Sequence, residues 1–244
     1  MADGVDGEHI DCLTELFERI RNTRHQSGTF GNYFEYNGDT TEDIPYIGTH
    51  FLSGLVSYYS LTGDMRALNA AQECANFLLG HGNAFYARMA DPTGPSQMTC
   101  WIVEGFADLY VETRNEDYLN AIRRIVKECM GQYYNAHSHG YLTTLRGILK
   151  AGICAEDQEL IDLVCARRQE LLDNGCILPN GDISESFPHS RRNEGCSIAD
   201  WIMLNLIYAH HFDDETAYAM AEHSLWNALF FNQFVTGGFG HRFF

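Results

Sequence analysis

A helix–turn–helix unit recurs along this chain of 244 residues, and it limits what the chain can fold into. In each copy one helical pattern ends, a tight acidic turn follows, and a second helical pattern begins. The copies start at Tyr59, Tyr110 and Tyr208, and residues 155–157 form a weaker copy. Paired helices that recur at intervals of a few tens of residues are typical of helical-repeat proteins, in which each pair is buried by its neighbours.

Hydrophobic periodicity predicts about nine helices and no strand. The predicted helices are Glu8–Arg21, Pro45–Leu61, Asp64–Leu79, Gln97–Thr113, Glu116–Met130, Gly140–Gly152, Asp157–Asp173, Ser197–His211 and Asp213–Phe231. The helix at 197–211 is apolar nearly all round, which favours burial on most sides, whereas the helix at 157–173 has one apolar stripe and a charged back. Alternating inner and outer helices predict an all-α fold of the α/α-toroid type. A full (α/α)6 barrel of six pairs needs about twelve helices, so the toroid is incomplete, or further helices lack a clear pattern, or another part closes the ring.

Length and composition favour one domain. A hydrophobic fraction of 45% is enough for one large core, so we predict a single domain over residues 1–244, with residues 1–7 disordered. The sequence has neither a secretory leader pattern nor an apolar run of bilayer length. Its eight cysteines include no C-x-x-C pair, which indicates reduced core thiols and a cytoplasmic location.

The net charge of the chain limits the classes of partner that it is expected to bind. A formal net charge of −17 argues against nucleic acid and anionic membranes, since both need clustered Lys and Arg. The same charge favours neutral or cationic ligands. An incomplete ring also suggests a homo-oligomer or a partner chain that closes the toroid.

Candidate ligand-binding residues lie in the loops that enter inner helices. All inner helices of a toroid begin on one face, so we expect these loops to meet at one mouth and to bind a small molecule or an oligosaccharide there. Imidazoles can hold sugar hydroxyls or transfer protons, and aromatic rings can stack on sugars, but either can also belong to the core. The candidates outside the longest loop are Tyr46, His50, Trp101, His137 and His139.

The segment Gly181–Trp201 is polar and precedes the most apolar helical pattern. Ser197 is the predicted N-cap of that helix, and Asp200 completes an aspartate variant of the capping box. Glu194 and Cys196 would then lie just outside a helix N-terminus. The partial positive charge there favours a carboxylate and a thiolate over their neutral forms.

Glu185 and Glu194 form a candidate carboxylate pair. Glycoside hydrolysis needs a proton donor for the leaving oxygen and a second group at the anomeric carbon. Phe187 and Pro188 could raise the pKa of Glu185 by desolvation and keep it protonated. The alternative is that both are solvated loop acids among the 33 acidic residues of the chain.

Glu194 and Cys196 could also supply two ligands to a metal ion, because Gly195 between them lets the backbone bring both side chains to one point. A structural zinc site uses four ligands, so two make an incomplete site. The alternative is a buried thiol at the start of a helix.

The sequence G-D-I-S-E-S-F, followed by N-E-G-C-S-I-A-D-W-I-M-L-N-L and by A-L-F-F-N-Q, resembles the β-L-arabinofuranosidase family of glycoside hydrolases, from about Tyr46 onward. The resemblance implies a toroidal catalytic domain with Glu185 as general acid/base and zinc on Glu194 and Cys196. It also implies that His50 and His139 contact the sugar, while a further family histidine would align near Thr99.

One family feature has no counterpart in this sequence. The family nucleophile is a zinc-bound cysteine of an adjacent cysteine pair, in a β-domain that follows the toroid. The chain contains no adjacent cysteines and stops at Phe244. Zinc would keep two of its four ligands, and the family mechanism could not run in this polypeptide alone. The chain would be a fragment or half of a complex, or would perform other acid-catalysed chemistry in the same mouth, or would only bind a ligand.

Three functional hypotheses follow. The first is a carbohydrate-active, glycoside hydrolase-like enzyme with Glu185 as proton donor in the mouth. The second is a lyase, isomerase or cyclase that uses acid catalysis without a metal on the same scaffold. The third is a non-catalytic sugar-binding or interaction module.

Overall fold

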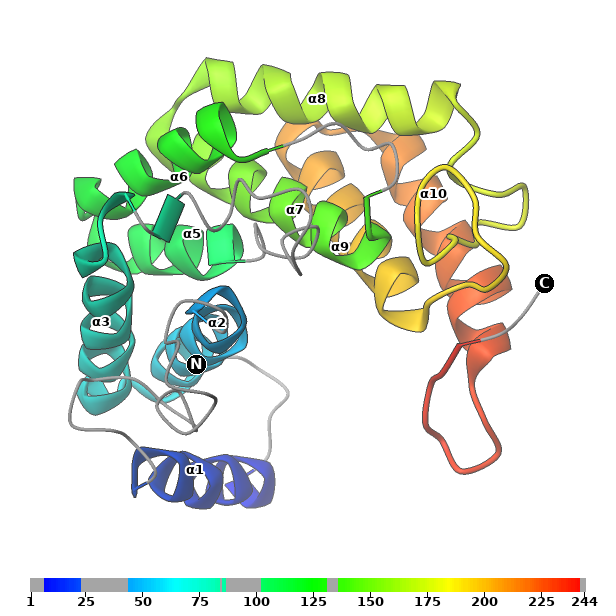
Figure 1. Ribbon diagram of the computed structural model, residues 1–244. Coiled ribbons are helices and arrows are strands. Elements are labelled where there is room, and N and C mark those ends of the chain that lie inside the picture. The colour runs from blue at the N-terminus through cyan, green and yellow to red at the C-terminus, as the bar shows by residue number, and fades with distance from the viewer. Residues whose placement is uncertain (1–6, 23–43, 84, 87–101, 131–135, 242–244) are drawn as a thin grey trace. The chain divides into compact units, whose positions relative to one another are not determined.

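The computed structural model describes residues 7–22, 44–83, 85–86, 102–130 and 136–241. Within these ranges the chain forms nine α-helices and no strand (Figure 1). The helices are α1 (Gly7–Asn22), α2 (Ile44–Thr62), α3 (Met65–Gly80), α5 (Ile102–Thr113), α6 (Glu116–Glu128), α7 (Ser138–Ala155), α8 (Gln158–Asp173), α9 (Gly195–Phe212) and α10 (Glu215–Ser224). The predicted all-helical content is confirmed for the described residues; residues 97–101 of one predicted helix lie outside them.

The acidic turns of the repeat begin helices because their polar side chains cap them. Asp64 accepts a hydrogen bond from the backbone N–H of Arg66 at 2.9 Å, at the start of α3. Asn115 caps α6 in the same way, and Asp214 caps α10. An N-cap side chain satisfies a backbone donor that the helix itself leaves without a partner. These caps are the physical reason that the turns could be located from the sequence.

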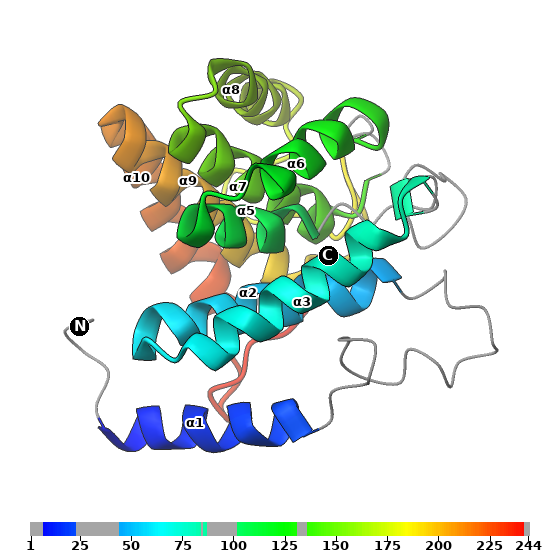
Figure 2. The ribbon, with the colours of Figure 1, turned by 90° about the vertical axis from the view of Figure 1, so that its left-hand side faces the viewer.

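The chain separates into two compact units, the first made of residues 1–91 and 102–129 and the second of residues 92–101 and 130–244. In the first unit α2 packs against both α3 and α5 (Figure 2). Gly105 of α5 allows a close approach, since a Cβ at this position would lie 2.7 Å from Cβ of Leu52. The single domain expected over residues 1–244 stays a prediction.

In the second unit α7 packs against α8 and α9, and α9 packs against α10. Trp201 of α9 is fully buried, as expected for an inner helix. Met203 and Leu206 of α9, however, are 45% and 39% exposed. The helix is thus buried on most of its surface, as expected, and one face is exposed because α7 and α10 do not cover it.

The last predicted helix, Asp213–Phe231, is interrupted. Its α-helical part ends at Ser224 and continues as a π-helical turn, Leu225–Leu229, and a 3-10 turn, Phe230–Asn232. Asn232 is fully buried and its side chain lies 3.4 Å from that of Asn193. The chain then forms a hairpin with an isolated bridge between Gln233 and Phe239.

A loop between α8 and α9 positions the candidate site. Isolated bridges join Ile177 to Ile183 and Ser184 to Asn193 within the loop, and a third joins Ser186 to His137 before α7. The buried side chain of Asn193 donates to Asp182 at 2.7 Å and braces the same loop. The loop therefore holds Glu185 beside the start of α7 and Glu194 at the start of α9. In the described part of the chain, no helix combines the length and the apolarity that a membrane span needs.

Candidate active site

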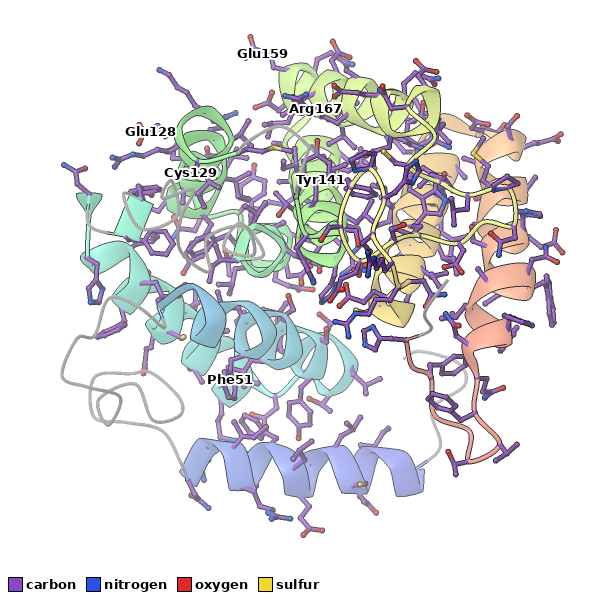
Figure 3. All side chains as sticks on the ribbon, turned by 45° about the vertical axis from the view of Figure 1, so that its right-hand side comes forward. Phe51, Glu128, Cys129, Tyr141, Glu159 and Arg167 are labelled. Atoms are coloured by element: carbon purple, nitrogen blue, oxygen red, sulfur yellow. The ribbon has the colours of Figure 1, made fainter. Side chains whose placement is uncertain are left out.

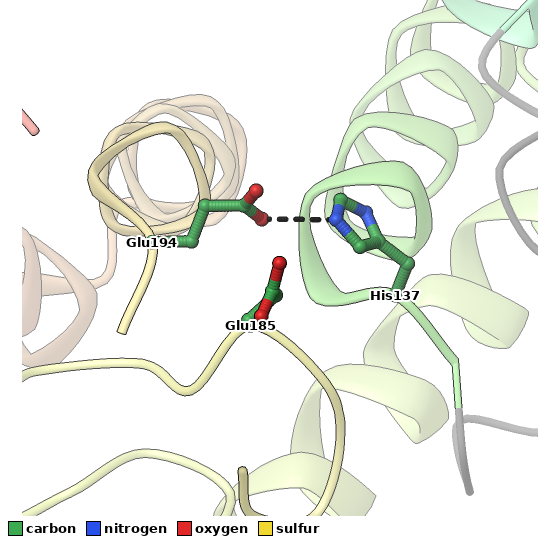
Figure 4. Close-up of side chains that lie close together, drawn as sticks. All are labelled: His137, Glu185 and Glu194. Carbon is green, nitrogen blue, oxygen red and sulfur yellow. Dashed lines mark ion pairs between the residues drawn. The ribbon is translucent and has the colours of Figure 1, made fainter. Parts of the chain in front are cut away.

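Three separate segments bring His137, Glu185 and Glu194 together (Figure 4). His137 precedes α7, Glu194 precedes α9, and Glu185 comes from the loop between α8 and α9. One ligand atom from each side chain lies within 4.8 Å of the others. We refer to these side chains as the three-residue group. The expected meeting of Glu185 with Glu194 is confirmed as geometry.

The start of α9 differs from the prediction. The helix begins at Gly195 with Glu194 as its N-cap residue, so the predicted N-cap at Ser197 and its pairing with Asp200 are wrong. Ser197 lies in the first turn, fully buried, and donates its hydroxyl to Oε2 of Glu194 at 3.0 Å. Its hydroxyl also lies 2.7 Å from that of Ser138, at the start of α7. The serine thus joins the two helix starts instead of capping one.

Glu194 is buried and negatively charged. Its carboxylate lies 3.2 Å from Nε2 of His137. Burial alone would raise the pKa of this carboxyl, but hydrogen bonds from His137 and Ser197 outweigh burial and lower the pKa below its usual value. The lowered pKa favours the charged form expected from the sequence, and its cause is these hydrogen bonds.

Glu185 pairs with Arg192, which the sequence analysis did not anticipate. Nε of Arg192 donates to Oε2 of Glu185 at 2.6 Å, and its Nη2 donates to the other oxygen. These bonds lower the pKa of Glu185 against a smaller opposing effect of burial, so the predicted upward shift is wrong. Phe187 is buried in the core, where its ring and that of Tyr141, labelled in Figure 3, form a T-shaped pair.

Cys196 does not carry the expected thiolate. Burial, reinforced by the charges of Glu194 and Asp200, raises the pKa of its thiol to about 12. The positive end of α9 does not overcome these effects. The thiolate prediction is therefore wrong for the chain on its own.

The side chains near Glu194 are of kinds that bind divalent cations, since imidazole and carboxylate groups are ordinary zinc ligands. His137, Glu185 and Glu194 form the only group of three or more potential metal ligands among the described residues. Cys196 hydrogen-bonds to Glu194 but lies outside this group. The zinc site on Glu194 and Cys196 stays a prediction.

A second imidazole–carboxylate pair lies beside the three-residue group. Nδ1 of His139 bonds to Oδ2 of the buried Asp200, and the ring of His139 is 6.2 Å from that of His137. Burial alone would lower the pKa of His139, but Asp200 outweighs burial and raises it. His139, a predicted sugar contact, therefore lies next to the catalytic candidates.

The structure does not describe the side chains of three other predicted sugar contacts. Tyr46 and His50 lie in α2, at positions whose side chains the structure does not describe, and Trp101 lies outside the described residues. Their roles stay predictions. The pairings of Arg192 with Glu185 and of Asp200 with His139 were missed because no local periodicity links these residues.

The helical fold holds two carboxylates and two imidazoles close together, at the starts of α7 and α9 and in the loop between α8 and α9. A family model described as the catalytic domain of GH127 β-L-arabinofuranosidase matches residues 15–244. The chain belongs to this family. No curated protein matches the sequence.

Solved structures share the fold. A GH127 β-L-arabinofuranosidase from Geobacillus stearothermophilus T6 matches with a TM-score of 0.69 and 16% identity, over 95% of this chain and 44% of that one. A sugar epimerase from a ruminal bacterium matches with a TM-score of 0.68 and 14% identity, over 98% of this chain and 75% of that one. The all-α, α/α-toroid class is confirmed. The chain spans less than half the length of the matched arabinofuranosidase.

Proposed function

We propose that the second unit carries the acid/base site of a glycoside hydrolase that acts on β-L-arabinofuranosides, with Glu185 as general acid/base. The observation that carries this proposal is the approach of Glu185, Glu194 and His137 to within 4.8 Å. Membership in the family supports the reaction class and the sugar. A neutral sugar also suits a strongly acidic chain, because it brings no charge to be repelled.

The spacing of the carboxylates suggests a stereochemical outcome. Retaining glycosidases hold their two carboxyl groups about 5–5.5 Å apart, whereas inverting enzymes leave roughly 6.5–9.5 Å for a water molecule. One oxygen of Glu185 lies within 4.8 Å of one oxygen of Glu194, which is closer to the shorter spacing than to the longer one. We therefore expect the product to keep the anomeric configuration of the substrate.

Glu194 has two possible roles in this proposal. Its carboxylate faces the anomeric carbon itself, or it holds zinc there together with Cys196. Zinc would stabilise the thiolate form of a coordinating cysteine. Metal analysis of the purified protein separates these roles, since only the second gives a stoichiometric metal content that falls in Cys196→Ser.

The ion pair between Arg192 and Glu185 has to open during the reaction. A general acid must carry a proton before it can protonate a leaving oxygen. Arg192 stabilises the unprotonated form of Glu185. We infer that a bound substrate separates the two side chains, so that Glu185 takes up a proton only when the site is occupied.

Glu185→Gln tests the proposal directly. The amide keeps the size of the side chain but cannot exchange a proton, so turnover of a methyl β-L-arabinofuranoside, whose leaving oxygen is basic, should fall by roughly 10²–10⁴-fold. Glu159→Gln is the matched control, because Glu159 is exposed at the start of α8 (Figure 3). Equal turnover of wild type and Glu185→Gln would exclude the role.

A second candidate is a sugar isomerase. The favouring observation is the pair of neighbouring imidazoles, His137 and His139, each bonded to a buried carboxylate. Such a pair could remove and return a proton next to the carbonyl of a reducing sugar. Incubation with reducing sugars in D₂O separates the candidates, because isomerisation places deuterium on carbon and hydrolysis does not.

A further inference from the structure

One face of α7 meets a single aspartate of α9. His139, Thr143 and Arg146 follow one another at helical spacing, and all three side chains lie on this face. Nδ1 of His139 bonds to one oxygen of Asp200, while Nη1 of Arg146 donates to the other oxygen at 2.7 Å. The hydroxyl of Thr143 lies 3.4 Å from the same Nδ1. Both oxygens of Asp200 are therefore engaged by side chains of α7.

Burial fixes this arrangement. The side chain of Asp200 is 6% exposed, and that of Arg146 is 14% exposed. A buried carboxylate is costly unless it is paired and hydrogen-bonded, and Arg146 supplies the compensating charge. Arg146 fixes the position of the Asp200 carboxylate through Oδ1, and Oδ2 then determines where the imidazole of His139 can lie.

The bond at Nδ1 also determines which ring nitrogen can hydrogen-bond to a ligand. The two nitrogens of an imidazole are distinct, and a hydrogen bond at one of them sets the orientation and tautomer of the other. With Nδ1 turned toward Asp200, only Nε2 can meet a bound sugar. The His139 side chain keeps 21% of its surface exposed, and its ring neighbours that of His137.

We infer that Asp200, held by Arg146, is a positioning residue that orients the imidazole of His139 so that Nε2 hydrogen-bonds a hydroxyl of the bound sugar. The inference rests on the proposed function for the identity of the sugar. It assigns Asp200 a role that its place in the sequence, four residues after Cys196 and inside a helix, does not indicate.

Asp200→Asn tests the inference without depending on turnover. In the ¹H–¹⁵N NMR spectrum, the hydrogen bond to Asp200 should protect the Nδ1–H of His139 from exchange and give an observable signal, assigned by its loss in His139→Gln. Asp200→Asn should abolish that signal. L-arabinose titrated into the labelled protein should bind roughly tenfold more weakly, the size expected for one lost hydrogen bond. KM should rise more than kcat falls.

Asn205→Ala is the matched structural control. Asn205 is fully buried on the same helix and accepts two hydrogen bonds from Arg168 of α8, at 2.6 and 3.0 Å. Its removal should lower the unfolding temperature but leave the His139 signal and L-arabinose affinity unchanged. If Asp200→Asn does not fold, Arg146→Gln should produce the same changes to a smaller degree.

Two results would overturn the inference. One is an Nδ1–H signal and an L-arabinose affinity in Asp200→Asn that match those of the wild type. The other is an equal loss of affinity in Asn205→Ala, which would show that any weakened helix contact has this effect. Failure of the proposed function is distinguishable, since Glu185→Gln would then keep its turnover while the NMR changes at His139 still occur.

Discussion

Arg192 controls the charge of Glu185, the proposed acid. Its hydrogen bonds lower the pKa of the carboxyl, so the protonated fraction of Glu185 is small at neutral pH. A general acid works only while protonated, and activity that depends on it falls as the pH rises through its pKa. This residue therefore sets the alkaline limit of activity in our account.

Arg192→Gln should move that limit. Without the guanidinium the pKa of Glu185 rises, so the descending limb of kcat/KM against pH should shift to higher pH. The measurement is a pH–rate profile of wild type and variant. Arg191→Gln is the control, since the neighbouring Arg191 is exposed. A profile of Arg192→Gln that overlays the wild type would show that Glu185 is not the titrating acid.

Candidate site residues could be predicted where the neighbouring sequence alone identified them. Glu185 and Glu194 were found from their loop and the helix that follows, and they lie together as expected. Their electrostatic environments were predicted less well. The shift of Glu185 has the opposite sign because Arg192, seven residues away in an irregular loop, makes a contact that no sequence pattern encodes.

At the level of elements, the start of α9 depends on two glycines. A Cβ on Gly195 would lie 2.7 Å from the carbonyl oxygen of Gly240, in the C-terminal hairpin. A Cβ on Gly240 would lie 2.4 Å from the ring of Phe234. The hairpin thus packs directly against the residue between Glu194 and Cys196.

Gly195→Ala should therefore disturb both the fold and the site. Contacts this short force the backbone to move, and overpacking of this kind costs about 1–3 kcal/mol of unfolding free energy. Chemical denaturation measures the loss. Gly238→Ala is the control in the same hairpin, because the nearest atom to its Cβ would be 3.9 Å away. Equal stability of the two variants would contradict the close packing.

Helices were predictable where caps mark their ends. Asp64, Asn115 and Asp214 begin helices close to the predicted positions because each side chain caps the backbone. The start of α9 was predicted two residues late. Serine is common at N-caps, but the hydroxyl of Ser197 bonds to Glu194 and Ser138 and caps no backbone N–H of α9. A competing tertiary contact decided the boundary.

At the scale of the whole molecule, large apolar side chains are exposed near the end of the chain. Trp226 is 61% exposed and Phe231 is 63% exposed. Others follow within a few residues, namely Phe230, Phe234, Val235 and Phe239. Exposed large apolar side chains gathered in one short segment favour association. The net charge of −17 opposes it by repulsion between copies.

Self-association should therefore increase with salt. Salt screens repulsion between exposed charges but leaves the apolar attraction in place. Light scattering of the 27.7 kDa chain should give a mass that rises with ionic strength, and Trp226→Ser with Phe231→Ser should remove most of the rise. Leu16→Ser, at a position that is 50% exposed on α1, is the control. A monomeric mass at every salt concentration would contradict this prediction.

The all-helical class could be predicted because the repeat is encoded locally, in caps and apolar periodicity. The grouping of helices into two compact units could not, since it depends on contacts between segments far apart in the sequence. Residues 102–129, for example, belong with the N-terminal part of the chain, whereas residues 136–241 belong to the other unit.

The central claim is tested most directly by how the loss of kcat/KM in Glu185→Gln varies with the leaving group of the substrate. A general acid matters most when the leaving oxygen is basic and little when it is already a good leaving group. We predict that the variant loses far more kcat/KM on a methyl β-L-arabinofuranoside than on the 4-nitrophenyl glycoside. Equal losses on both substrates would show that Glu185 does not donate the proton, and the account of this site would be wrong.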